Sequence, residues 1–360
     1  MSVYLESIDV LQLEISNFCN ADCFHCVRTE TLSSHLNSKF IPIDIFKKLL
    51  DNKYGTKFKT LEFCGTIDEP FAHPYFLDII DVIYQYNKTV EISIHTNGSI
   101  RNKEFYAELA KKLLKFKKHV VRFSIDGLEN SVYLYRGLRN YENIIDNARS
   151  FIDNGGTAIW QMILFPWNKE ELDKCKDLAE KYNFAKFIVR KNRGKDTNYS
   201  PVELRKEREN GRIKGHIIPY TQLEKYNQDE IEKNFLEMSL NLDKELNISC
   251  HFQKEKKMFL DHQGYIWPCC FLSNPTWRRK AEKIEIEEKL VKKYGKNFNS
   301  LYENSLDHII ESKWYQNDLV KSWTEKFHIT SGCFSKCIKT CNNNSVVSER
   351  TIVKFKENYG

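Results

Sequence analysis

Residues 10–26 read VLQLEISNFCNADCFHC, a short apolar run followed by closely spaced cysteines. The run at residues 10–16 is rich in strand-forming residues and predicts a β-strand. Cys19, Cys23 and Cys26 follow it in a C-x3-C-x2-C pattern. Soft sulfur ligands select iron-sulfur clusters or zinc, and thiolates at this spacing can hold three corners of an iron-sulfur cube. The fourth iron is then open to a bound molecule, whereas a structural zinc site is normally closed by a fourth protein ligand.

Further β-rich runs follow along the chain, with helical segments between them. The expected strands cover residues 10–16, 60–65, 91–98, 120–127, 158–164 and 186–190, and the expected helices cover residues 43–50, 76–86, 102–116, 141–154 and 169–182. Strands so rich in Val, Ile and Phe are typical of a parallel sheet that is buried on both faces. The alternation predicts an α/β fold, either a barrel or a doubly wound sheet, with its ligand site at the carboxyl ends of the strands.

The cysteine motif resembles that of the radical S-adenosylmethionine (radical SAM) superfamily, C-x3-C-x-aromatic-C. His25 stands at the aromatic position, and its imidazole is also a flat ring that can pack near adenine. The resemblance implies a partial (β/α)6 TIM-like barrel over residues 1–194, a [4Fe-4S] cluster on the cysteines and S-adenosylmethionine on the open iron. The alternative is a zinc knuckle that uses His25 or Cys64 as its fourth ligand.

Short segments at the ends of the next strands resemble the cofactor-binding motifs of that family. GTIDEP at residues 65–70 occupies the place of G-G-E-P, although Ile67 and Asp68 replace the paired glycines. TNGS at residues 96–99 and SIDG at residues 124–127 look like the T-N-G and S-I-D-G segments near the ribose. The resemblance implies these cofactor-binding residues: His25, Gly65, Asp68, Glu69, Pro70, Asn97, Ser99, Ser124, Asp126, Asn168 and Arg190. A structural salt bridge is an equal interpretation for Arg190.

A second group of cysteines lies in the C-terminal part, after a polar and charged segment at residues 195–246 that we interpret as a helical bridge or cover. The run KMFLDHQGYIWPCC predicts a β-hairpin with its turn at Gly264. Cysteines flank this hairpin in a pattern that resembles SPASM and twitch domains, which carry auxiliary iron-sulfur clusters. We therefore expect a small α+β domain over residues 247–345, followed by a tail at residues 346–360.

The later cysteines form only C-x3-C-x3-C, shorter than the full SPASM pattern. Six cysteines cannot ligate two four-iron clusters completely, so we expect one auxiliary [4Fe-4S] cluster. The expected ligands are Cys250, Cys269, Cys337 and Cys341, with Cys270 and Cys333 as substitutes. The alternative is a structural zinc ribbon.

The composition excludes several classes of protein. With 41% hydrophobic residues the chain of 360 residues can build a core, and it has no apolar run long enough to span a membrane and no signal peptide at its start. The net charge of +6 is a mild excess and makes a nucleic-acid partner improbable. An odd count of 11 cysteines without an export signal argues against a disulfide framework and favours a cytoplasmic protein.

The resemblance implies an enzyme that cleaves S-adenosylmethionine to a 5′-deoxyadenosyl radical and takes a hydrogen atom from its substrate. With the auxiliary cluster as electron acceptor, we expect a two-electron oxidation of a small polar or sugar-like substrate. A leader-binding domain, frequent in peptide-modifying members, does not precede the first strand at about residue 10. The alternatives are a peptide- or protein-modifying maturase and a non-enzymatic zinc-binding module. A flavodoxin- or ferredoxin-type protein is the expected electron donor, and no catalytic residue is assigned.

Overall fold

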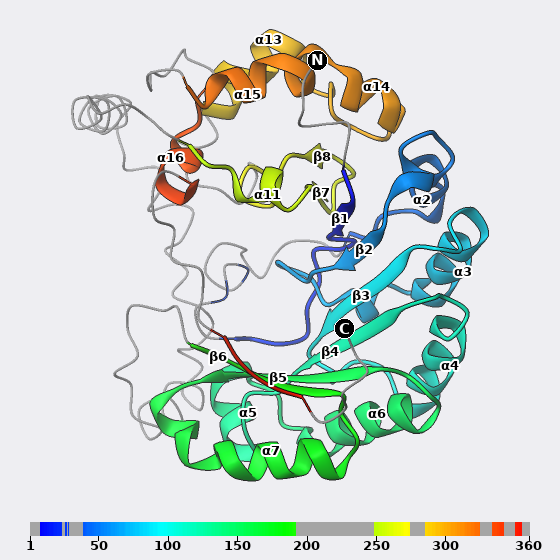
Figure 1. The fold of residues 1–360 in the computed structure, drawn as a ribbon, viewed down its shortest axis with the longest axis vertical. Helices are drawn as coiled ribbons and strands as arrows, with labels where there is room; N and C mark the ends of the chain where they lie inside the picture. The colour runs from blue at the N-terminus through cyan, green and yellow to red at the C-terminus, as the bar shows by residue number, and fades with distance from the viewer. Residues whose placement is uncertain are drawn as a thin grey trace. The chain divides into compact units, whose positions relative to one another are not determined.

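The described part of the chain forms two compact units (Figure 1). The computed structural model describes residues 8–23, 26, 28, 39–191, 248–273, 285–324, 333–341 and 350–354. The sheet unit contains the described residues within 14–40, 60–217 and 347–360, and the hairpin unit contains those within 1–13, 41–59 and 218–346.

Parallel strands form the centre of the sheet unit. They are β2 (Thr60–Phe63), β3 (Glu91–Thr96), β4 (His119–Ser124), β5 (Ala158–Leu164) and β6 (Lys186–Lys191), each paired in parallel with the next. Figure 1 shows them side by side in sequence order, with helices along one side. The helices are α3 (Phe76–Tyr86), α4 (Lys103–Leu113), α5 (Glu129–Arg136), α6 (Tyr141–Asp153) and α7 (Leu172–Lys181). The predicted α/β fold is confirmed.

The helices form where sequence signals favour them. Helix α4 begins at Asn102, whose side chain accepts a hydrogen bond from the Phe105 amide at 3.2 Å and so caps the helix. Its apolar residues recur at helical spacing and are buried, including Tyr106 and Leu113. Helix α5 ends at Gly137, which adopts the left-handed conformation (φ 69°) that glycine tolerates best.

The hairpin unit contains the first strand of the chain. Strand β1 (Val10–Leu13) pairs in parallel with β7 (Lys257–Leu260), and β7 pairs antiparallel with β8 (Ile266–Trp267). The predicted hairpin is therefore present, with its turn at Gly264 in the left-handed region (φ 81°). The helices of this unit are α2 (Ile43–Leu50), α11 (His251–Lys254), α13 (Lys292–Tyr294), α14 (Leu306–Glu311), α15 (Leu319–Ser322) and α16 (Ser335–Cys341). The expected domain boundaries at residues 194 and 247 thus differ from the boundaries of these two units. Strand β1 was expected in the first domain, but it belongs to the hairpin unit because it pairs with β7.

Some elements depart from the sequence prediction. Helix α5 and strand β9 (Arg350–Lys354), which pairs antiparallel with β6, were not expected. Residues 192–247, which include the whole expected bridge at residues 195–246, lie outside the described part of the chain. Within the part that is described, no helix is both long enough and apolar enough to cross a membrane.

Trp160 of β5 anchors the core between the sheet and its helices. Its side chain is fully buried, packs at 5.4 Å between ring centroids against Phe184, and donates a hydrogen bond of 2.9 Å to the Ile125 carbonyl. Burial of a side chain this large, with its one polar atom satisfied, contributes strongly to stability.

Replacing Trp160 with alanine is expected to lower the free energy of unfolding by about 3–5 kcal/mol, because it leaves a cavity. It also leaves the Ile125 carbonyl without its donor. Urea denaturation followed by circular dichroism measures the loss. The control is Tyr75→Ala, since the Tyr75 side chain is 58% exposed; its change should stay within about 0.5 kcal/mol. Equal losses in both variants would contradict this role for Trp160.

Candidate cofactor site and auxiliary cysteine pocket

A cavity of about 350 Å³ lies in the sheet unit, where the loops after several strands meet. Its volume falls in the range typical of small-molecule sites. Of the residues predicted from the sequence, the following line it: Cys19, Cys23, Cys26, Gly65, Asp68, Glu69, Asn97 and Ser124. The cavity thus brings together side chains that are up to about a hundred residues apart in sequence.

The cysteine loop is held in place by its own backbone and by α5. The Cys26 amide donates to the Cys23 carbonyl at 3.3 Å, and the Asp22 amide donates to the carbonyl of Arg136 at 2.9 Å. Two N–H groups also reach the sulfurs, since Asn97 Nδ2 lies 3.7 Å from Cys19 Sγ and Arg136 Nη1 lies 3.9 Å from Cys23 Sγ. Hydrogen bonds of this kind are typical of the surroundings of metal-bound thiolates.

Glu69 joins the loop after β2 to the end of β3. Its carboxylate accepts hydrogen bonds from Thr96 Oγ1 at 2.6 Å and from the Asn97 amide at 2.7 Å. Burial raises the pKa of Glu69 to about 7, although these hydrogen bonds favour the charged form. The Glu69 carboxylate therefore ties GTIDEP, residues 65–70, to the end of β3. It holds the backbone of this segment although Ile67 and Asp68 replace the paired glycines of G-G-E-P.

Asp68 performs a similar task toward the segment after β1. Its Oδ2 accepts hydrogen bonds from the amides of Ile15 and Ser16, at 2.9 and 3.1 Å. Its Oδ1 is buried in the cavity wall and has no hydrogen-bond partner among the described residues. Burial, with the nearby carboxylate of Glu14, raises the pKa of Asp68. An unpartnered buried oxygen of this kind can accept a hydrogen bond from a bound ammonium group.

At the end of β4, Asp126 forms a buried ion pair with Arg136 of α5. Asp126 Oδ2 lies 2.6 Å from Arg136 Nε, and Asp126 Oδ1 accepts from the Ile163 amide at 2.6 Å. Burial raises the pKa of Asp126, while the guanidinium of Arg136 opposes the shift. Arg136 and the adjacent Tyr135 both line the cavity.

Arg136 and Tyr135 were not predicted from the sequence as site residues. The signal was available, because the segment after SIDG ends in an arginine, Arg136, that can fold back over the strand end. Arg136 could be recognised as a site residue only together with α5, which was not predicted from the sequence.

The other predicted cofactor contacts lie behind the cavity wall or outside the described residues. Ser99 donates to Asn97 Oδ1 at 2.7 Å, and Pro70 begins a short buried 3-10 helix. Asn168 is fully buried and its amide hydrogen-bonds to three backbone groups. Arg190 does not line this cavity, and His25 lies outside the described part of the chain.

The donor set fits an iron-sulfur cluster with a bound small molecule. Burial and the nearby carboxylate of Glu69 raise the pKa of the Cys19 thiol, so a cation is needed to stabilise its thiolate. The three cysteines share one cavity with the unpartnered Asp68 Oδ1. This cavity leaves room beside the thiols for a ligand with polar groups.

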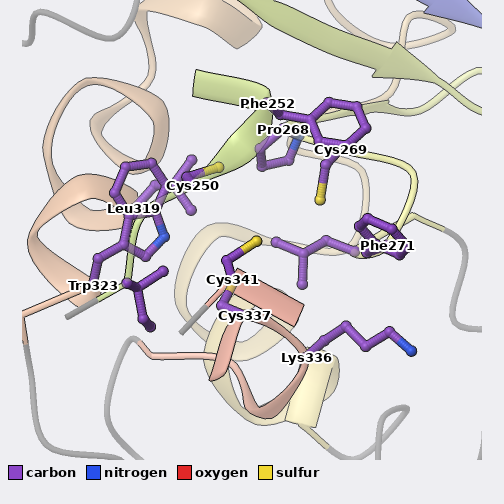
Figure 2. Close-up of a pocket in the computed structure, with 12 residues that line it drawn as sticks. Cys250, Phe252, Pro268, Cys269, Phe271, Leu319, Trp323, Lys336, Cys337 and Cys341 are labelled. Carbon is purple, nitrogen blue, oxygen red and sulfur yellow. The ribbon is translucent and has the colours of Figure 1, made fainter. Parts of the chain in front are cut away.

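The four predicted auxiliary ligands lie together in the hairpin unit. Cys250, Cys269, Cys337 and Cys341 line one narrow apolar pocket, and Cys270 and Cys333 do not line it. Figure 2 shows the sulfurs of Cys250, Cys269 and Cys341 directed into the same space. Among the described residues, no three cysteine, histidine or carboxylate side chains converge closely enough for a single metal ion. A thiol set around an apolar pocket fits a cluster that is ligated by the protein alone.

The thiols of this pocket influence one another. The hydrogen bond between Cys250 and Cys341 lowers the pKa of Cys341 to about 6 and raises that of Cys250. Burial, with the neighbouring thiols, raises the pKa of Cys337. Mutual influence of this kind indicates that the sulfurs are close enough to act as one site.

A buried ion pair holds the start of α16, the helix that carries Cys337 and Cys341. Glu285 and Lys289 lie 2.8 Å apart with side chains almost fully buried. Glu285 also accepts hydrogen bonds from the amide and hydroxyl of Ser335, at 2.7 and 2.6 Å. The helix that carries Cys337 and Cys341 is therefore held by residues that do not line the pocket.

Comparisons with known proteins agree with both sites. Residues 13–179 match the model of the radical SAM superfamily, and residues 250–342 match that of the SPASM iron-sulfur cluster-binding domain. A probable GTP 3′,8-cyclase of Methanocaldococcus jannaschii is 26% identical over 76% of this chain and 91% of its own. A GTP 3′,8-cyclase of Desulforamulus reducens is 23% identical over 36% of this chain and only 38% of its own length.

Solved structures show the same fold. SuiB of Streptococcus suis bound to S-adenosylmethionine aligns with a TM-score of 0.52 at 17% identity, over 87% of this chain and 65% of that one. Native anSMEcpe with bound S-adenosylmethionine aligns with a TM-score of 0.50 at 17% identity, over 85% and 81%. This chain therefore carries a radical SAM domain over residues 13–179 and a SPASM iron-sulfur cluster-binding domain over residues 250–342, which support a [4Fe-4S] cluster, S-adenosylmethionine and an auxiliary iron-sulfur cluster as its cofactors.

Proposed function

We propose that this radical SAM enzyme oxidises a small polar or sugar-like substrate by two electrons, with the auxiliary cluster as electron acceptor. The observation that carries the proposal is the difference between the two thiol sites. The cavity of the sheet unit holds the three cysteines of one loop among polar side chains, and its fourth cysteine, Cys64, comes from the end of β2 with its Sγ 3.6 Å from Thr66 Oγ1. The pocket of the hairpin unit has four cysteines and apolar walls. A cluster closed by four thiolates has no free position for a substrate, so electron transfer is the role left to it.

Cys19, Cys23 and Cys26 would hold the first cluster, and Asp68 and Ser124 would contact S-adenosylmethionine. When bound, the cluster and S-adenosylmethionine together supply an electron and a radical that can take a hydrogen atom from an unactivated C–H bond. The chain's own part is to orient the substrate and to exclude water. Arg136, held by Asp126, keeps a positive charge beside Cys23. A flavodoxin- or ferredoxin-type protein is the proposed electron donor.

A peptide substrate is the second candidate. The neighbour anSMEcpe has also been solved with the peptide Cp18Cys, and it aligns with this chain at a TM-score of 0.50 and 15% identity. A residue of a peptide and an alcohol carbon of a sugar both offer a C–H bond for abstraction. The small-molecule fraction and the peptide fraction of a cell extract are assayed separately to distinguish these two candidates. The fraction that contains the substrate raises the release of 5′-deoxyadenosine, and the substrate in it is consumed.

Cys23→Ala is expected to abolish dithionite-dependent release of 5′-deoxyadenosine and to lower the iron content by one cluster's worth, because two thiols hold a cluster poorly. Anaerobic reconstitution, iron and sulfide analysis and chromatography of the products measure both effects. The matched control is Cys175→Ala, since Cys175 is buried in α7 and does not line the cavity. Undiminished release in Cys23→Ala would refute the assignment of the first cluster.

Cys337→Ala is expected to lower the iron content while S-adenosylmethionine cleavage without substrate persists, because the two clusters have separate ligands. Cys333→Ala is the control, since the Cys333 side chain is buried but does not line the pocket. Comparison of these two variants also tests whether Cys337 or Cys333 is a ligand of the auxiliary cluster. Full iron content in Cys337→Ala, or loss of iron only in Cys333→Ala, would show that the four-cysteine set is wrong.

A further inference from the structure

The ion pair of Asp126 and Arg136 places a full positive charge next to one sulfur of the cysteine loop. Arg136 Nε lies 2.6 Å from Asp126 Oδ2, and Arg136 Nη1 donates to Cys23 Sγ at 3.9 Å. Only 11% of the Arg136 side chain is exposed, and the Asp126 side chain is fully buried. Solvent therefore screens these two charges weakly, so they can act strongly on a nearby redox centre.

Backbone contacts fix the position of this guanidinium. The Arg136 carbonyl accepts a hydrogen bond of 2.9 Å from the amide of Asp22, which belongs to the cysteine loop. On the other side of the pair, Asp126 Oδ1 accepts from the Ile163 amide at 2.6 Å, so the carboxylate is held by β5. The place of the cation relative to Cys23 is therefore set by two segments of the chain.

The two members of the ion pair affect a cluster on the cysteine loop in opposite directions. Reduction adds a negative charge to the cluster, so a nearby cation favours the reduced form and a nearby carboxylate favours the oxidised form. A hydrogen bond to a ligating sulfur also favours the reduced form. Arg136 contacts the sulfur of Cys23 itself, whereas Asp126 is held by Arg136 and Ile163. The cation is therefore the stronger of the two influences.

We propose that Arg136 acts on the first cluster through Cys23 and raises its reduction potential, and that Asp126 limits this rise. The inference rests on the proposed assignment of that cluster to Cys19, Cys23 and Cys26, and it is independent of the substrate. A higher potential lets an electron donor reduce the cluster more readily, whereas a lower potential gives the electron more driving force toward S-adenosylmethionine. An ion pair with one charge closer to the sulfur holds the potential between these two demands.

A potentiometric titration of the reconstituted full-length enzyme, followed by electron paramagnetic resonance, tests this proposal. No S-adenosylmethionine is added, so a change in its binding does not enter the result. The signal of the first cluster is the one that is absent from Cys23→Ala. The auxiliary cluster serves as an internal reference, because it has separate ligands, and its midpoint potential should be equal in all variants.

Arg136→Gln should lower the midpoint potential of the first cluster by about 59 mV or more, which is a tenfold change in a one-electron equilibrium. Asp126→Asn should raise it. The double variant Arg136→Gln with Asp126→Asn does not leave a buried carboxylate without its cation, and so guards against misfolding of the single variant. Its potential should lie between those of the wild-type enzyme and Arg136→Gln. Arg136→Lys keeps the charge and should stay closer to the wild-type potential than Arg136→Gln does.

Arg139→Gln is the matched control. Arg139 follows Arg136 by three residues, is exposed and packs at 4.2 Å over the ring of Tyr133. It does not line the cysteine cavity. The midpoint potential of this variant should equal that of the wild-type enzyme.

Equal midpoint potentials in the wild-type enzyme, Arg136→Gln and the double variant would overturn the inference. Shifts of the same sign in Arg136→Gln and Asp126→Asn would also overturn it, because a purely structural role of the ion pair predicts them. Both outcomes leave the assignment of the first cluster intact. A first-cluster signal that persists in Cys23→Ala would instead refute that assignment, and the inference with it.

Discussion

Two adjacent buried carboxylates, Asp68 and Glu69, hold the cofactor site together. Asp68 binds the amides after β1, and Glu69 binds the hydroxyl and amide at the end of β3. Burial alone disfavours both charges, and several hydrogen bonds to each carboxylate offset that cost. Because these contacts join three loops, the positions of the cysteines, the ribose-side residues and the strand ends are set by one small network. The rest of the site depends on it.

The two cysteine sites differ in the surroundings of their sulfurs. In the cavity, amide and guanidinium groups reach two of the sulfurs, and charged residues line the wall. In the pocket, aromatic and aliphatic side chains such as Phe252, Leu319 and Trp323 surround the thiols. Hydrogen bonding and solvent exposure set the reduction potential of an iron-sulfur cluster. The chain thus provides two electronically different environments for two clusters.

The sheet interior is unusual for a structural core. Barrel interiors of this architecture are commonly filled with branched apolar side chains. Here the inner face carries Glu62, His95, Arg122, Gln161 and Arg190, while the outer face carries Trp160 and Phe187 in close packing. The apolar packing therefore lies on the side covered by helices, and the polar side contributes His95 and Gln161 to the lining of the cavity.

The sequence by itself determined the α/β alternation, the cysteine loop after the first strand and the hairpin between Cys250 and Cys269. These features are local, since each depends on the spacing of residues within one segment. The tertiary structure alone decided which side chains line the cavity. Arg136 reaches Cys23 only because α5 returns over the cysteine loop, and Asn168 is withdrawn because its amide satisfies backbone groups. It also decided that β1 pairs with β7, since contacts between segments far apart in the chain depend on packing and hydrogen bonding that no local pattern records.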